Sequence, residues 1–190
     1  MKDKFPGYFK EDKESRNKIW SNSLFVFDAN ILLNLYRYSD PTRQEFLRIM
    51  ERLQGKIFLP HRAAQEYLDN RLVVIDQQEK LYEKTSLQIT TLKTDLENSH
   101  QHPFVSSTLM ETANRIFEDL LVELESNKLI HTTRINEDEI KNSIAAIFEN
   151  CVGHPYDVEK LKEIIELGEE RYSQEIPPGF KAASQGGYRG

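Results

Sequence analysis

Two short apolar runs in the first third of the chain predict neighbouring β-strands. The first, residues 24–27, contains four large apolar residues, which fits a strand buried on both faces, as in a parallel sheet covered by helices. The second, residues 56–60, is closed by Pro60. Residues 31–36 and 40–55, between the two runs, have helical patterns. The order strand, helix, strand predicts a βαβ unit, in which the strands are parallel.

The middle of the chain has the pattern of a long helical hairpin. A helical pattern begins at His61, and its apolar stripe narrows beyond Gln77. A turn around residues 99–103 is followed by a matching apolar stripe over residues 109–124. We therefore expect an antiparallel hairpin, with the residues from about 72 to 127 forming an excursion from the body of the domain.

Capping signals mark the starts of three further helices. Asp40 followed by proline is typical of a helix start. Asn136 with Glu139 matches a capping box, and Asp157 has the position of an N-cap for a last helix that runs to about Tyr172. No segment after residue 60 has the pattern of a buried strand.

These elements divide the chain into four parts. They are an arm with a short helix and docking aromatic residues (1–22), the first part of an α/β domain (23–71), the hairpin insertion (72–134), and helices and a turn that lead back to the domain (135–190). Two short strands do not make a stable sheet, because about three or more covered strands are needed. We expect the chain to be the amino-terminal part of a longer protein; the alternatives are a second chain that completes the sheet, or a misread helical segment.

Composition says more about the setting than about the chemistry. The 190 residues carry a net charge of −6, so no basic surplus indicates a nucleic-acid partner, although a nuclease needs only a local basic rim. The single cysteine, Cys151, cannot form an internal disulfide, which fits a reducing, cytoplasmic setting. No apolar run approaches membrane-spanning length, so we expect no membrane partner.

Two carboxylates are placed where parallel strands end. Asp28 ends the first strand, and Glu66 lies one to two turns into the helix after the second, so both should face one crevice. Carboxylate oxygens completed by water suit Mg²⁺ or Mn²⁺. Other roles remain open: Asp28 as a helix cap, and Glu66 as a solvated residue paired with Arg62 or Asn70. Asn30 is a helix cap or a partner that orients Asp28.

Basic side chains near these acids are candidates for contacts with phosphate. Arg62 and Glu66 share a helix face, so Arg62 or Arg71 could contact a phosphate while the acids hold the metal ion. Lys56 and Arg37 complete the predicted nucleic-acid-binding rim.

Three blocks of sequence carry a resemblance to a known family. The blocks are FVFDANILLNLYR at residues 25–37, FLPHRAAQEY at residues 58–67 with Asn70 and Arg71, and Arg171-Tyr172 with PPGF at residues 177–180. Together they resemble the PIN-like nucleases, and more narrowly a bacterial branch whose domain is interrupted by a long helical insertion.

The resemblance implies a fold, an activity and a metal site. The fold is a three-layer α/β/α domain with parallel strands, mostly helical here. The activity is metal-dependent hydrolysis of phosphodiester bonds, usually in RNA, and Asp28 and Glu66 match two of the family's metal-binding acids. The family places further acids after the Pro-Pro-Gly turn, whereas Ala182-Ala183 follows here and the chain ends at Gly190. We therefore expect an incomplete domain that is active in a longer form or with a completing partner.

Two other functions fit parts of the pattern. A phosphatase of the haloacid-dehalogenase type would use Asp28 as its nucleophile, but it needs a general acid two residues later, where Asn30 cannot donate a proton in that role. A non-catalytic PIN-like domain would instead bind a partner protein through its helical hairpin.

Overall fold

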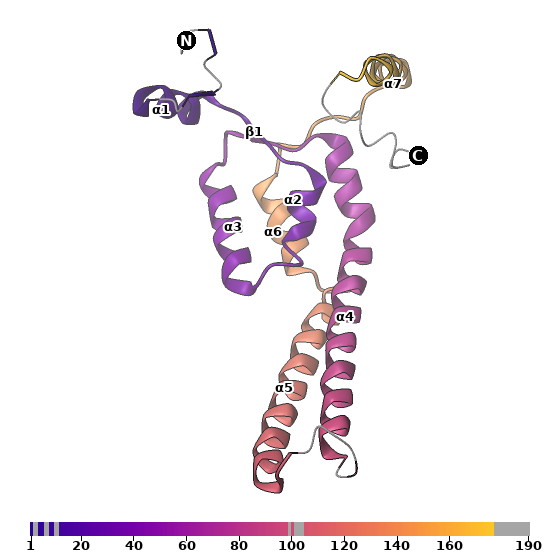
Figure 1. Ribbon diagram of the computed structural model, residues 1–190. Coiled ribbons are helices and arrows are strands. Elements are labelled where there is room, and N and C mark those ends of the chain that lie inside the picture. Colours follow the sequence, from indigo (N-terminus) through magenta and orange to yellow (C-terminus); the bar gives the residue numbers. More distant parts are fainter. Residues whose placement is uncertain (2–3, 6–7, 10–11, 99, 101–104, 177–190) are drawn as a thin grey trace. The chain divides into compact units, whose positions relative to one another are not determined.

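The computed structural model describes residues 1, 4–5, 8–9, 12–98, 100 and 105–176. The chain divides into two compact units, Met1–Gly153 and His154–Gly190. The elements, labelled in Figure 1, are α1 (Lys13–Asn22), β1 (Phe25–Val26), α2 (Ala29–Asn34), α3 (Asp40–Arg52), β2 (Ile57–Phe58), α4 (His61–Glu97), α5 (Ser107–Thr133), α6 (Glu139–Ile147) and, in the second unit, α7 (Val158–Ser173). The described part of the chain is therefore mostly helical, as predicted.

The two predicted strands form a parallel pair. Phe25 lies opposite Ile57 and Val26 opposite Phe58, which confirms the βαβ prediction. Backbone hydrogen bonds extend the pairing at both ends: Phe25 N–H donates to Lys56 O at 2.7 Å, and Phe27 N–H donates to Phe58 O at 3.1 Å. The carboxyl ends of both strands therefore lie at the same edge of the sheet.

A third piece of parallel pairing follows α6, where the sequence predicted no strand. Val152 forms a parallel bridge with Leu59. In this bridge Leu59 N–H donates to Cys151 O at 3.0 Å, and Gly153 N–H donates to Leu59 O at 2.9 Å. A Cβ on Gly153 would lie 2.8 Å from Cζ of Phe58, so any larger residue would require the Phe58 ring to shift. In the described residues Val152 forms a single bridge and not a strand, which agrees with the prediction that no buried strand follows residue 60. The bridge itself was not predicted, because one apolar residue is too short for an alternating pattern.

The prediction that the first strand is buried on both faces is wrong. Leu24 and Val26 are 59% and 60% exposed. In the described residues β1 pairs only with β2 and is an edge strand, whereas periodicity reports apolar character and not which neighbours are present. The ring of Trp20 lies 5.1 Å from that of Phe25.

The core lies between α2, α3, α6 and the first turns of α4. Its largest fully buried side chains are Tyr36, Phe148, Leu32, Leu35, Met50, Ile75 and Ile140. Helix α2 contacts α4, and α3 contacts α6 (Figure 1). Ile140, Ile144 and Ile147 form the buried face of α6, and Phe148 at its C-cap is buried as well.

Helices α4 and α5 pack along each other as the predicted hairpin (Figure 1). Two ion pairs give their direction: Lys93 Nζ lies 3.4 Å from Glu118 Oε1, and Lys128 Nζ lies 3.8 Å from Glu83 Oε1. From residue 83 to residue 93 along α4, the paired residue on α5 changes from 128 to 118, so the two helices are antiparallel. The buried side chains of α4 end at Ile75, which explains the narrowing stripe. The predicted turn at 99–103 lies almost wholly outside the described residues, and the insertion boundaries stay a prediction.

Two of the three predicted caps are displaced. Ser39, not Asp40, is the N-cap of α3, with proline in its first turn. Asp138, not Asn136, caps α6, and its side chain accepts a hydrogen bond from Lys141 N–H. Asp157 is confirmed as the N-cap of α7. The shift at α6 arises because Asp138 is also held by tertiary partners that no local pattern encodes.

The arm at the start of the chain contains the predicted short helix, α1. Its aromatic residues do not all dock as expected: Phe5 and Tyr8 are exposed and contact each other edge to face. The third block of the resemblance, at residues 177–180, lies outside the described residues. No helix in the described part of the chain is long and apolar enough to cross a membrane.

Candidate metal site at the ends of the parallel strands

Asp28 stands between the end of β1 and the start of α2. Continuing the strand register by two residues places it level with Pro60, the residue before α4. One carboxylate oxygen accepts a hydrogen bond from Ala29 N–H at 2.8 Å, which makes Asp28 the N-cap of α2. The other accepts one from Asn30 Nδ2 at 3.2 Å. A carboxylate has about four acceptor positions, so this capping leaves oxygen lone pairs for another ligand.

Glu66 lies in the second turn of α4 and is half-buried. It is five residues past His61, or about 7–8 Å along the helix axis. Its backbone carbonyl accepts a hydrogen bond from Asn70 Nδ2 at 2.8 Å. Since α2 contacts α4 and both begin at the same edge of the sheet, the two acids come from adjoining elements.

A buried polar network ties α2 to α4 and to the start of α6. Tyr36 O–H donates to Asp138 Oδ2 at 2.7 Å, and the hydroxyls of Tyr36 and Tyr67 lie 2.9 Å apart. Arg71 Nη1 donates to the same carboxylate oxygen at 2.9 Å. Burial, followed by the neighbouring Tyr67, raises the pKa of Tyr36 far above its usual value, so its hydroxyl stays a neutral donor. This network fixes the helices that carry Asp28 and Glu66.

The same network bears on the predicted role of Arg71. Its side chain is only 14% exposed and forms an ion pair with Asp138. The guanidinium group of Arg71 is therefore engaged in the interior of the domain, which argues against the predicted contact between Arg71 and phosphate.

Arg62 is the predicted rim residue best placed beside the acids. It is exposed and lies one helical turn before Glu66 on α4. Its Nη1 donates to Gln65 Oε1 at 3.5 Å. A side chain in this position can extend over the strand ends with its charge in solvent.

The other two predicted rim residues lie further away. Arg37 follows the end of α2 and donates to Asn34 Oδ1 at 2.9 Å, so the length of α2, about 9 Å, separates its backbone from Asp28. Lys56 precedes β2, at the opposite end of the strand pair, and its Nζ donates to Trp20 O at 3.4 Å. Neither position favours a shared site with Asp28.

The donor set suits one largely hydrated ion. Among the described residues, no group of three or more His, Cys, Asp or Glu side chains is placed to hold a metal ion. Asp28 and Glu66 provide two carboxylates, and Mg²⁺ commonly takes one or two carboxylates with water filling its octahedron. The chemistry of these residues therefore fits a single Mg²⁺ or Mn²⁺ ion, and a two-metal site would need further acids.

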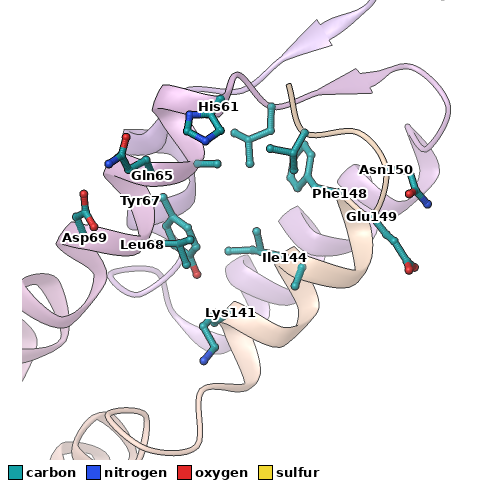
Figure 2. Close-up of a pocket in the computed structure, with 14 residues that line it drawn as sticks. His61, Gln65, Tyr67, Leu68, Asp69, Lys141, Ile144, Phe148, Glu149 and Asn150 are labelled. Carbon is teal, nitrogen blue, oxygen red and sulfur yellow. The ribbon is translucent and has the colours of Figure 1, made fainter. Parts of the chain in front are cut away.

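A cavity of about 600 Å³ lies between α4 and α6 (Figure 2). His61 and Gln65 line it from α4, Ile144 and Phe148 from α6, and Val152 from the bridge to β2. Neither predicted acid belongs to this lining. The lining is therefore distinct from the two candidate metal ligands, and it includes both members of the Leu59–Val152 bridge. The sequence analysis did not find this cavity, although His61, Gln65 and Asp69, which line it from α4, are polar residues spaced four apart.

Comparison with known proteins identifies a family for this chain. A family model described as a PIN like domain matches residues 24–188. The chain belongs to this PIN-like domain family. Comparisons with curated proteins and with solved structures found no match.

Proposed function

We propose that this chain carries a metal-dependent nuclease site that hydrolyses phosphodiester bonds in RNA, with Asp28 and Glu66 as the protein ligands of Mg²⁺ or Mn²⁺. One observation carries the proposal: in a PIN-like domain, Asp28 follows one strand of a parallel pair, and the helix after the other strand bears Glu66. Ligands of open α/β sheets bind outside the carboxyl ends of such strands.

Each residue has a distinct part in this proposal. Asp28 and Glu66 bind the ion through carboxylate oxygens, and Asn30 orients Asp28 through its side-chain hydrogen bond. Arg62 holds a phosphate of the substrate by charge and hydrogen bonding. The chemistry that a bound ion supplies is a water of lowered pKa for in-line attack on phosphorus.

We further propose that an additional strand completes the sheet beside Val152. Val26 and Val152, at the two ends of the strand order in the described residues, are both exposed. Exposed strand edges favour pairing with another segment. Another segment or a partner protein would supply that strand, together with the further acids that a two-metal site needs.

Cleavage of labelled RNA tests the proposal. We expect the longest available form of the protein to cut single-stranded RNA with Mn²⁺ or Mg²⁺ and to lose that activity in a chelator. Single-stranded DNA of the same sequence is the matched substrate and should be cut more slowly. Cleavage that persists in the chelator contradicts metal dependence, and equal rates on both substrates contradict the RNA assignment.

Arg62→Gln should weaken RNA binding without changing its sequence preference, because phosphate contacts carry no base information. We expect a several-fold loss of affinity and a salt slope that is less steep by about 0.7, the value for one phosphate contact on a single strand. Arg115→Gln, which removes an exposed charge from α5, is the control and should leave both values unchanged. If the two variants behave alike, Arg62 does not contact the substrate.

A non-catalytic PIN-like domain is the second candidate. The absence of a third acid near the site within the described residues favours it. The same cleavage assay separates the candidates, because a non-catalytic domain cuts no substrate with either ion, even in its longest form.

A further inference from the structure

A second cavity lies where the α2–α3 loop meets α3, α4 and α5. Its volume is about 230 Å³. Three of its lining side chains are basic and buried, namely Arg43, His131 and Arg134, and we call it the basic cavity. Tyr82, Asn127 and the acidic Asp40 also belong to its lining. None of these residues takes part in the candidate metal site.

The two arginines that line the basic cavity are more deeply buried than their carboxylate partners. The side chain of Arg43 is 8% exposed, whereas that of its partner Asp40 is 68% exposed. Arg134 is 4% exposed, whereas its partner Glu139 is 58% exposed. Solvent screens the outer carboxylates much more strongly than it screens the buried guanidinium groups. Among the lining residues, the two guanidinium groups and the one carboxylate of Asp40 leave an excess of positive charge.

The guanidinium groups retain hydrogen-bonding capacity. Arg134 donates from Nε to Glu139 Oε1 at 2.8 Å, its Nη2 lies 2.7 Å from the same oxygen, and its Nη1 lies 3.4 Å from His131 Nδ1. Within the described residues these contacts use three of its five N–H donors. Arg43 Nη1 reaches two backbone carbonyls at 3.4 Å, which are long hydrogen bonds. A better acceptor could replace them.

His131 reports the same positive environment. Burial, followed by the charges of Arg134 and then Arg43, lowers its pKa to about 4, and the opposing effects of Asp40 and Glu139 are smaller. Its ring packs against Tyr82 at a centroid distance of 5.4 Å. His131 is therefore neutral near pH 7. The two arginines supply the positive charge of the cavity.

We propose that the basic cavity binds a small tetrahedral oxyanion of the phosphate type. Planar guanidinium groups recognise phosphate oxygens through paired N–H donors, and two arginines line this cavity together with Tyr82 and Asn127. At about 30 Å³ per water molecule, the volume corresponds to roughly eight waters, enough for a phosphate group with some of its hydration. The proposal is independent of the nuclease site.

An NMR titration of metal-free protein with inorganic phosphate tests the proposal. At constant ionic strength and pH 7, the ring signals of His131, assigned by comparison with His131→Gln, should shift and saturate. Sulfate should act in the same way and acetate should not. Bound phosphate should also raise the pKa of His131 by about one unit or more, because a nearby negative charge favours the protonated ring.

Variants locate the binding to the cavity. Arg134→Gln should weaken phosphate binding by about tenfold or more. Asn127→Asp, which adds a negative charge to the lining with little change in volume, should abolish phosphate binding. This variant tests the proposal if Arg134→Gln does not fold. Arg48→Gln, on the same helix as Arg43 but outside the cavity, should bind as the wild type does. A linear shift with all three anions, acetate binding as strong as phosphate binding, or equal binding in Asn127→Asp would overturn the proposal.

Discussion

Asp138→Ala is expected to lower the free energy of unfolding by about 3–5 kcal/mol. The substitution leaves Arg71 without its carboxylate partner and Tyr36 without its acceptor, both in the interior of the domain. It also removes the N-cap of α6, where Asp138 accepts a hydrogen bond from Lys141 N–H at 2.8 Å. An uncompensated buried charge causes most of the loss, and the cap contributes about 1 kcal/mol of it.

Urea unfolding followed by circular dichroism measures the change in the free energy of unfolding, and thermal unfolding measures the change in melting temperature. The melting temperature should fall by about 6–20 °C for a domain of this size. Asp157→Ala is the control for the cap alone and should cost about 1 kcal/mol or less, because Asp157 is exposed and only caps α7. Arg71→Met combined with Asp138→Ala should recover part of the stability, since the unpaired charge is gone. A loss below about 1 kcal/mol in the single variant would contradict this account of the network.

The parallel pair and the hairpin were predictable because local patterns encode them. Runs of large apolar residues closed by Pro60 indicate short strands, and helical stripes on residues 61–97 and 107–133 indicate two long helices. The bridge at Val152 was not predictable, because one residue carries no period. Its pairing depends on Leu59, which lies 93 positions earlier in the chain.

Some residues of the candidate site and its supporting network could be predicted from the sequence, and others could not. Asp28 and Glu66 could be selected because each stands at a fixed distance after a predicted strand. Asp138, Arg43 and Arg134 could not be selected, because charged residues in a helical pattern usually indicate a solvated surface. The polar partners of Asp138 meet it only after folding: Tyr36 and Asp138 are 102 residues apart. The predicted rim failed to anticipate Arg71 in the same network for this reason.

Asp28→Asn is expected to reduce metal-dependent cleavage by more than about 100-fold, because loss of a direct ligand should exceed the 10–100-fold effect of changes around ligands. Asparagine is as good an N-cap as aspartate, so the start of α2 should keep its stability. Asp28→Ala should show the same loss of cleavage and, in addition, lower the free energy of unfolding by about 1 kcal/mol. Glu66→Gln should behave as Asp28→Asn does.

A second measurement keeps this prediction testable without the substrate. At ten times its dissociation constant, Mn²⁺ should stabilise the wild type by about 1.4 kcal/mol, and Asp28→Asn should lose most of that gain. Asp157→Asn is the matched control, because it makes the same change at an exposed N-cap that has no predicted ligand role. Capping survives in asparagine, whereas metal binding requires the carboxylate. If Asp28→Asn cleaves RNA and responds to Mn²⁺ as the wild type does, and Asp28→Ala is destabilised, then Asp28 only caps α2.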